Sequence, residues 1–144
     1  MQVFRQQEYV RVGDADAVRV FRDLWLERGL AILNALGLAV RHVPANDPFF
    51  GRRGRMLAAD QRDQELKFEL VVPICSTEKP TACASLNYHQ DHFAHLFGIK
   101  LPDGTNAHTA CIGFGTERIT LALFKTHGFD TAKWPATTRQ VLGL

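Results

Sequence analysis

Apolar residues recur with two different periods along the chain, and these periods predict strands and helices in alternation. Residues 4–12 alternate between apolar and polar side chains often enough to indicate a strand. The period then changes, and apolar residues recur at helical spacing over residues 15–36, where Gly37 follows as a stop signal. Asp14 precedes this helix and is its predicted N-cap, because a carboxylate can accept the unpaired N–H groups of the first turn.

The rest of the chain continues this mixture. Further strands are predicted at residues 39–43, 66–74, 82–88 and 107–112, and a short helix near residues 91–97. The last strand leads into a Gly-Phe-Gly turn and then an amphipathic helix, which ends with Lys125 and His127 before Gly128. The sequence therefore predicts an α/β (α+β) fold, a mostly antiparallel sheet flanked by helices, in one domain over residues 1–144.

Composition narrows the classes of protein to which the chain can belong. Its 144 residues suit one domain, and 46% hydrophobic residues can build a core. The net charge of +2 gives little support for nucleic-acid binding, which needs a concentrated basic surface. The sequence opens on no signal peptide and holds no apolar run near the roughly 20 residues that cross a bilayer, so a cytoplasmic protein without membrane contact is expected. The three cysteines fit reduced thiols or metal ligands.

Residues 109–128, TACIGFGTERITLALFKTHG, have a pattern typical of phosphate binding. Gly113 and Gly115 permit a positive φ and a close approach of the backbone to a ligand. The helix after them offers unpaired N–H groups, and Arg118 adds a guanidinium that can clamp a phosphate or stack on a base. The same pattern also fits an ordinary strand–helix junction in which Arg118 pairs with Glu117 or another neighbour.

Two other clusters carry candidate chemistry. His89, His92 and His95 lie close together in the sequence and, with Cys83, suggest a zinc site, although they also fit surface or packing positions. The segment GRRGR at residues 51–55 is the one basic cluster, and it fits either a solvated loop or a contact with phosphates or an acidic partner protein.

Several separated blocks resemble one enzyme superfamily. GFGTERITLAL is similar to motif 3 of the class II aminoacyl-tRNA synthetases, and MQVFRQQEYVR at residues 1–11 is similar to the second half of their motif 2 in its seryl form. NDPFFGRRGRM, LKFELVVPI and PTACASLNYHQDHFAHLFGI resemble a narrower group, the amino acid:[carrier protein] ligases, which are similar to an unusual seryl-tRNA synthetase. The resemblance covers roughly residues 1–134 and implies the C-terminal half of a class II catalytic domain, without motif 1 or the motif 2 arginine.

The resemblance implies an ATP site. It assigns nucleotide contacts to Met1, Phe4, Ala82, Cys83, Ala84, Ser85 and Arg118. Phe4 and Arg118 would cover the two faces of the adenine, and Arg118 would also act in catalysis by neutralising phosphate charge. An ordinary core position is the alternative for Phe4.

The resemblance also implies two metals. Its zinc ligands fall on Glu8 and Cys111, with a further cysteine before Met1, while a surface ion pair for Glu8 and simple burial for Cys111 remain the alternatives. Magnesium is expected with ATP, but Pro80 stands where the family has an acidic residue, which leaves Glu78 and Glu69 as candidate ligands.

The implied activity joins a small amino acid, glycine or alanine, to ATP as an aminoacyl-adenylate, and then transfers it to the phosphopantetheine thiol of a carrier protein. Glu8, through the zinc, and Asn87 would contact the amino acid, although Asn87 also fits a polar strand end. A homodimer is expected for the full-length protein. Transfer to tRNA, which the weak charge disfavours, and a non-catalytic binding module are the alternatives.

The long predicted helix offers a candidate surface for the carrier protein. Arg19, Arg22 and Arg28 lie on this helix and could steer an acidic partner together with the GRRGR segment. The alternative is that these arginines only keep an amphipathic helix in contact with water.

Overall fold

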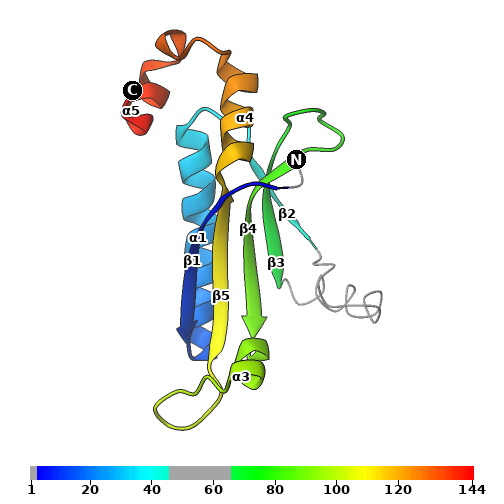
Figure 1. The fold of residues 1–144 in the computed structure, drawn as a ribbon, viewed down its shortest axis with the longest axis vertical. Helices are drawn as coiled ribbons and strands as arrows, with labels where there is room; N and C mark the ends of the chain where they lie inside the picture. The colour runs from blue at the N-terminus through cyan, green and yellow to red at the C-terminus, as the bar shows by residue number, and fades with distance from the viewer. Residues whose placement is uncertain (1–2, 46–65) are drawn as a thin grey trace.

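The structure is a computed structural model that describes residues 3–45 and 66–144. Met1 and the GRRGR segment, for which the sequence predicts contacts, lie outside these residues. The described residues form a five-stranded sheet with the order β1-β5-β4-β3-β2, in which every pair of neighbours is antiparallel (Figure 1). The strands are β1 (Gln6–Gly13), β2 (Arg41–Pro44), β3 (Lys67–Val72), β4 (Thr81–Gln90) and β5 (His108–Gly115). The predicted antiparallel α/β fold is confirmed.

The long helix α1 (Ala15–Ala35) runs along one face of the sheet, behind the strands in Figure 1. It begins where the sequence predicts, because the Asp14 carboxylate accepts hydrogen bonds from the backbone N–H groups of Asp16 at 3.1 Å and Ala17 at 2.8 Å. It ends at Leu36, and Gly37 follows with a φ of 75°, in the left-handed region that glycine tolerates.

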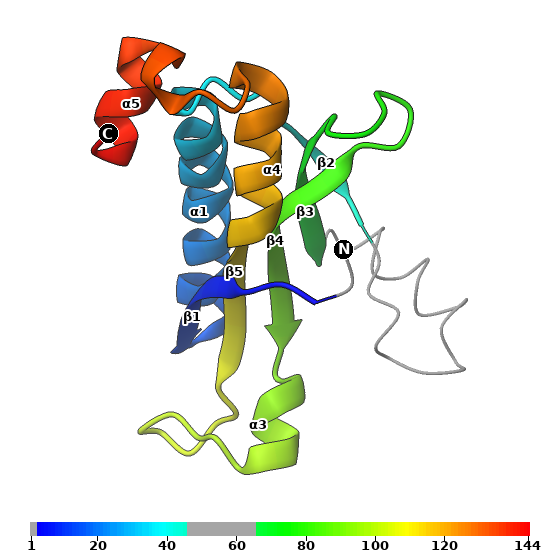
Figure 2. The same cartoon turned by 45° about the horizontal axis from the view of Figure 1, so that its top comes forward.

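The other helices within residues 3–45 and 66–144 are α3 (His92–Phe97), α4 (Thr116–His127), η2 (Thr131–Lys133) and α5 (Ala136–Leu142). Helix α4 continues upward from β5, and the chain then crosses over the end of α1, as the 45° turn of Figure 2 shows. The predicted Gly-Phe-Gly turn is wrong, because Gly113 and Gly115 belong to β5, and neither glycine has a positive φ. Strand and helix therefore join directly, with Gly115 as the N-cap of α4.

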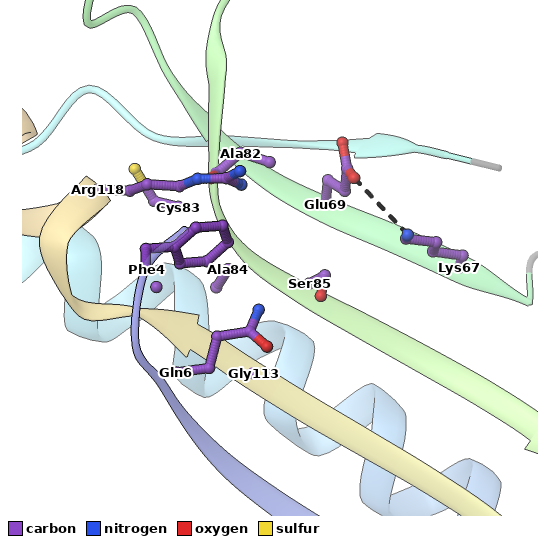
Figure 3. A pocket seen from close by; sticks show the side chains of 11 residues that line it. Phe4, Gln6, Lys67, Glu69, Ala82, Cys83, Ala84, Ser85, Gly113 and Arg118 are labelled. Atoms are coloured by element: carbon purple, nitrogen blue, oxygen red, sulfur yellow. Dashed lines mark hydrogen bonds and ion pairs between the residues drawn. The ribbon is translucent and has the colours of Figure 1, made fainter. Parts of the chain in front are cut away.

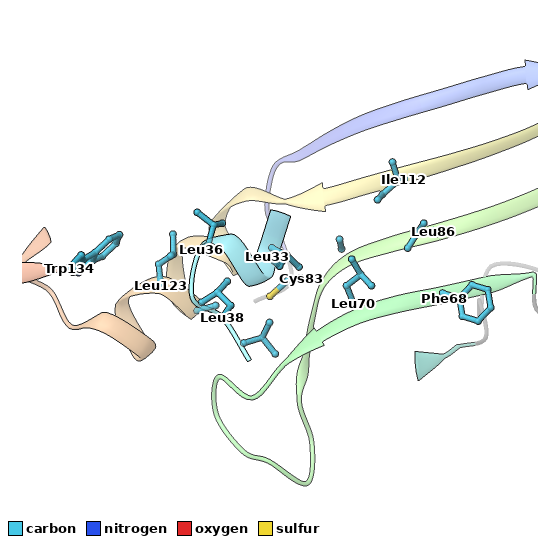
Figure 4. Packing of buried hydrophobic residues seen from close by; sticks show 13 residues of the cluster. Leu33, Leu36, Leu38, Phe68, Leu70, Cys83, Leu86, Ile112, Leu123 and Trp134 are labelled. Atoms are coloured by element: carbon cyan, nitrogen blue, oxygen red, sulfur yellow. The ribbon is translucent and has the colours of Figure 1, made fainter. Parts of the chain in front are cut away.

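The core lies between the sheet and helices α1 and α4. Leu33 of α1, Leu70 of β3, Leu86 of β4 and Ile112 of β5 are completely buried and belong to one cluster (Figure 4). Trp134 closes the end of this cluster against α4, where its ring lies edge-on to Phe124 with centroids 5.8 Å apart. The burial of these aliphatic side chains on one face explains why the sequence pattern predicts the sheet and helices well.

The opposite face of the sheet carries polar residues in two rows across four strands. Since Ile112 faces α1, its neighbours Cys111 and Gly113 face away from that helix. One row follows the register through Glu8, Gly113, Ser85 and Glu69, from β1 to β3. The next row follows it through Val10, Cys111, Asn87 and Lys67. Residues that are far apart in the sequence thus meet on one open face.

Helix α1 does not present all of its arginines to solvent. The Arg22 side chain is only 11% exposed, and its guanidinium lies 5.5 Å from the centre of the Phe68 ring. Arg19, at 51% exposed, pairs with Asp16 at 2.9 Å. Arg19 is thus exposed, as the predicted surface for a carrier protein requires, whereas the Arg22 side chain packs against Phe68.

Among the described helices, none has the length and apolar character needed to cross a lipid bilayer.

Gly29 sets how closely α1 approaches the sheet, and this predicts a stability effect. A Cβ atom there would lie 2.7 Å from Leu70 Cδ1 and 3.3 Å from Ile112 Cδ1. We expect Gly29→Ala to lower the free energy of unfolding by about 1–3 kcal/mol in urea denaturation, because the completely buried Leu70 and Ile112 side chains must shift within a packed core. The loss should appear although alanine favours helix by about 1 kcal/mol.

The matched control is Asn34→Ala at an exposed position of the same helix, which should change stability by less than about 0.5 kcal/mol. An increase in stability for Gly29→Ala would contradict the close packing.

Candidate functional site

A cavity of about 260 Å³ opens on the polar face, next to the start of α4 (Figure 3). The lining comes from the N-terminal segment, strands β1, β3, β4 and β5, and the first turn of α4. The lining residues are Phe4, Gln6, Lys67, Glu69, Ala82, Cys83, Ala84, Ser85, Gly113, Gly115 and Arg118. The cavity thus brings together Phe4, Arg118 and the four strand residues that the sequence assigns to ATP contacts.

Arg118 is held firmly at one end of this cavity. Its guanidinium carbon lies 3.8 Å above the centre of the Phe4 ring, and its Nη1 donates a hydrogen bond to the Ala82 carbonyl at 3.0 Å. Gly115 permits this arrangement, because a Cβ there would come within 3.1 Å of Phe4 and 3.4 Å of Arg118. The ordinary core position considered for Phe4 is wrong, since Phe4 is only half-buried, lines the cavity and belongs to neither of the buried hydrophobic clusters.

The contact between Phe4 and Arg118 closes the space that the sequence assigns to adenine. A flat base stacked between two groups needs about 3.5 Å on each side, and therefore roughly 7 Å between them. The observed separation is 3.8 Å. A base can bind between them only after the two side chains move apart, whereas a base on the outer side of either group needs no such movement.

The N-terminal segment is tied to α4 by a second contact beside the first. The Glu117 carboxylate accepts hydrogen bonds from the Arg5 backbone N–H at 2.8 Å and from Arg5 Nε at 2.6 Å. Of the alternative in which Arg118 pairs with Glu117 or another neighbour, only the pairing with Glu117 is wrong, since Arg118 instead contacts Ala82 and Phe4. The hydrogen bonds from Arg5, with one from the Thr116 hydroxyl, lower the pKa of Glu117 to about 2.

The far end of the cavity holds one cation and one carboxylate. Lys67 Nζ lies 3.8 Å from Glu69 Oε1, and both side chains face the cavity opposite Ser85 and Asn87 in the register. Glu78 lies on the exposed turn between β3 and β4 and does not line the cavity. Of the two acidic candidates for magnesium, Glu69 is the one beside the cavity.

The predicted zinc ligands meet on the same face, next to the cavity. Cys111 Sγ donates a hydrogen bond to Glu8 Oε1 over 3.8 Å, and Asn87 Nδ2 donates to the same sulfur at 3.6 Å. Gly113 lets Glu8 lie over β5, because a Cβ there would come within 3.2 Å of the Glu8 side chain. Burial raises the pKa of the Cys111 thiol, and the Asn87 hydrogen bond opposes this effect.

The other candidate metal ligands, Cys83 and the histidines, have separate surroundings in the structure. Cys83 belongs to the apolar core as well as the cavity wall, and burial raises its pKa to about 11. His95 pairs with Asp91 at 2.8 Å, whereas His89 faces Cys111. No group of three histidine, cysteine or acidic residues within residues 3–45 and 66–144 is placed to hold a metal ion, so the predicted cluster of histidines with Cys83 is wrong for this part of the chain.

Two lining residues, Gln6 and Lys67, were missed by the sequence analysis. The signal for Lys67 was available, since residues 67 and 69 of a predicted strand must face the same side. The same rule applies to Gln6, which lies between Phe4 and Glu8 at a spacing of two residues in the strand predicted for residues 4–12, so its signal was also available.

The sheet order, the open polar face and the arginine at the start of α4 define the class of protein. The structure matches that of M. kandleri SerRS in complex with A. aeolicus tRNASec with a TM-score of 0.79, at 27% identity over 96% of this chain and 28% of that one. The seryl-tRNA synthetase from Pyrococcus horikoshii complexed with ATP shares the fold, with a TM-score of 0.67 at 14% identity, covering 98% of this chain and 31% of that one. The chain thus has the catalytic fold of the class II seryl-tRNA synthetases.

Sequence comparison narrows the class further. Over its whole length the chain is 50% and 51% identical to the amino acid–[acyl-carrier-protein] ligases 1 and 2 of Bradyrhizobium diazoefficiens. It is 30% identical to the type-2 serine–tRNA ligase of Methanopyrus kandleri, covering 92% of this chain and 26% of that one. The chain is a homologue of the amino acid–[acyl-carrier-protein] ligases, which confirms the resemblance seen in the sequence. No protein-family model matches it. It spans 44% and 43% of the lengths of these two ligases.

The low pKa of Glu117 predicts a specific pH dependence for the Arg5–Glu117 pair. Because the pKa in the folded state is about 2 and that of a free glutamate is 4.5, the pair stabilises the fold above about pH 4.5 and loses this effect as the pH falls towards 2. In urea denaturation, Glu117→Gln should therefore be less stable than wild type at neutral pH, and the difference should shrink below about pH 4.5.

The control is Asp130→Asn, which removes a carboxylate from an exposed ion pair with Lys133 far along the chain. A stability difference for Glu117→Gln that stays constant with pH would show that the carboxylate charge is not what holds the segment.

Proposed function

We propose that the chain is the C-terminal part of a catalytic domain that activates a small amino acid with ATP and transfers it to a carrier protein. The observation that supports this most is the open face, where the Phe4–Arg118 stack and the Glu8–Cys111 pair adjoin through Gly113. One end offers a cation and an aromatic ring for a nucleotide, and the other offers ligands for a metal. Identity of about half the residues with two carrier-protein ligases supports the same function.

Arg118 and the strand residues around it account for nucleotide binding in this proposal. The Arg118 guanidinium would neutralise phosphate charge as the amino-acid carboxylate attacks the α-phosphorus and pyrophosphate leaves. Its hydrogen bond to the Ala82 carbonyl fixes the guanidinium before the ligand arrives, which favours catalysis by positioning. Phe4 would stack on the base once it has moved from Arg118. Ser85 and Glu69, which face each other across β4 and β3, would hold the magnesium that accompanies ATP.

The residues at the other end fit a zinc ion as part of a ligand set. A thiol and a carboxylate that already approach within 3.8 Å are donors that zinc accepts, and the pair lies beside the cavity. The described residues contain no set of three such ligands, and we propose that the further cysteine implied by the resemblance completes the set. When bound, zinc supplies an open position for the amino group of the substrate. Asn87 would then stabilise the sulfur of Cys111 as well as contact the amino acid.

The substrate is proposed to be glycine or alanine. Asn87 and Glu8 both contact the Cys111 sulfur, so little space is expected around the point where the amino group would bind. The acceptor is proposed to be the phosphopantetheine thiol of a carrier protein, and the full-length protein a homodimer. The rival with specific support is transfer to tRNA, because the chain also resembles type-2 serine–tRNA ligases, although at 30% rather than about 50% identity.

The nucleotide half of the proposal predicts the behaviour of Arg118. In a form of the protein extended at the N-terminus, exchange of pyrophosphate into ATP should require a small amino acid. Arg118→Ala should lower the exchange rate about a hundredfold, because a preorganised positive charge is lost. Arg139→Ala, a change of the same kind on α5, should leave the rate near that of wild type. An Arg118→Ala variant with normal exchange would remove this residue from the site.

The acceptor is tested with the same preparation. After adenylate formation, labelled glycine or alanine should move to a phosphopantetheine-bearing carrier protein and not to tRNA. Charging of tRNA alone would replace the proposed function with that of a synthetase, and failure of both transfer and exchange would favour a binding module.

The proposed zinc site predicts that zinc binding requires Cys111 and not Cys75. Elemental analysis of the extended protein should find about one zinc per chain, and Cys111→Ser should remove it. Cys75→Ser is the control, because Cys75 is exposed and distant from the pair. Zinc that survives Cys111→Ser but is lost on changing His92 would assign the metal to the histidines instead.

A further inference from the structure

Three side chains surround the sulfur of Cys111, and only two of them enter the proposed function. Besides Glu8 Oε1 at 3.8 Å and Asn87 Nδ2 at 3.6 Å, the imidazole Nε2 of His89 lies 3.7 Å from Sγ. The other ring nitrogen, Nδ1, lies 3.0 Å from the hydroxyl of Thr109, which is buried. Each nitrogen of the His89 ring thus has a defined partner on β5.

The hydrogen bonds around the sulfur determine which nitrogen of His89 carries the proton. A thiol has one hydrogen to donate, and Glu8 accepts it. The sulfur then acts as an acceptor towards its other neighbours, Asn87 and His89. His89 must therefore carry its hydrogen on Nε2, and its Nδ1 accepts the hydroxyl hydrogen of Thr109. The network is complete only with this tautomer.

The backbone of β4 is irregular at the point that places this ring. The register between β4 and β5 shifts between Tyr88 and Gln90, so His89 is the extra residue of a β-bulge. Gln90 has a φ of 54°, a conformation that residues other than glycine seldom adopt. Bulges commonly redirect a side chain beside a functional site, and a strained residue persists where its surroundings require it. The bulge therefore supports a functional position for His89.

A third contact fixes the orientation of the ring. Phe93, in the first turn of α3, meets the His89 ring edge-on with centroids 4.9 Å apart. Rotation of the imidazole would break this contact and both nitrogen contacts together. The ring is therefore oriented before any ligand binds.

We propose that His89 is a positioning residue for Cys111, and that its Nε2–H and the Asn87 amide together hold the sulfur towards Glu8 as a metal ligand. The inference rests on the proposed function, because it assigns His89 to the same metal. Two N–H groups on a thiolate disperse its charge and fix its direction, and such outer contacts commonly change metal affinity 10–100-fold. Thr109, behind the ring, can donate its hydroxyl hydrogen to Nδ1 and so supports the tautomer that the contacts of the sulfur require.

The first test reads the tautomer directly. Long-range ¹H–¹⁵N spectra of the ¹⁵N-labelled chain, recorded under conditions in which the ring is neutral, should show His89 protonated on Nε2 and not on Nδ1. The signals are assigned by their loss in His89→Asn. Thr109→Val should weaken the preference for this tautomer. Protonation of wild-type His89 on Nδ1 would overturn the proposal.

The second test uses the N-terminally extended protein. It measures the affinity for cobalt from the thiolate-to-cobalt absorption band, which Cys111→Ser must abolish. His89→Asn places an amide near the position of Nδ1 and loses the contact with sulfur, so it should weaken binding 10–100-fold. His89→Gln can place an N–H near the position of Nε2 and should recover part of this loss. His92→Asn, at an exposed position of α3, is the matched control and should bind cobalt as wild type does.

The outcomes separate the inference from the proposed function. Wild-type affinity in His89→Asn, with the band lost in Cys111→Ser, would overturn the role of His89 and leave the metal assignment intact. An N-terminally extended wild-type protein without a Cys111-dependent band would overturn both the role of His89 and the metal assignment, and pyrophosphate exchange would still test the proposed nucleotide site.

Discussion

The lack of side chains at Gly113 and Gly115 is the constraint on which the site depends. Strand β5 lies between β1 and β4, and its two glycines leave the space that Glu8 and Phe4 occupy above the backbone. A methyl group at either position would meet one of these side chains at about van der Waals contact or closer. Both ends of the site, the aromatic stack and the Glu8–Cys111 pair, therefore depend on close approach to a single strand.

One face of the sheet supplies most of the stability of the fold, and the other face carries the candidate site. Leucine and isoleucine side chains on one face are buried against α1 and α4, and their burial supplies the main favourable free energy of folding. The other face holds its polar side chains through pairwise contacts, such as Lys67 with Glu69 and Asn87 with Cys111. A site on such a sheet is held by a rigid scaffold, because the strands that carry it are fixed by the core beneath.

The sequence predicts most of the fold, because the pattern of burial on α1 and the strands is regular. Asp14 as N-cap and the strand at β3 follow from local rules. The two glycines of β5 were misplaced in a turn, since a glycine that allows close approach and one that allows a positive φ look alike in a sequence. The resemblance pairs Glu8 with Cys111, and the structure places these two side chains 3.8 Å apart. The bulge at His89 could not be predicted, because a single extra residue in a strand leaves no trace in a polar segment.

The N-terminal segment meets α4 through two consecutive residues on each side: Phe4 contacts Arg118, and Arg5 binds Glu117. Because the backbone joins both pairs, a ligand that separates the first pair also pulls on the second. The free energy of opening is then shared between a cation–π contact and an exposed ion pair, of which the ion pair is the more sensitive to salt and acid. Any planar ligand that enters between Phe4 and Arg118 should therefore bind with an affinity that depends on ionic strength, even when the ligand itself is uncharged.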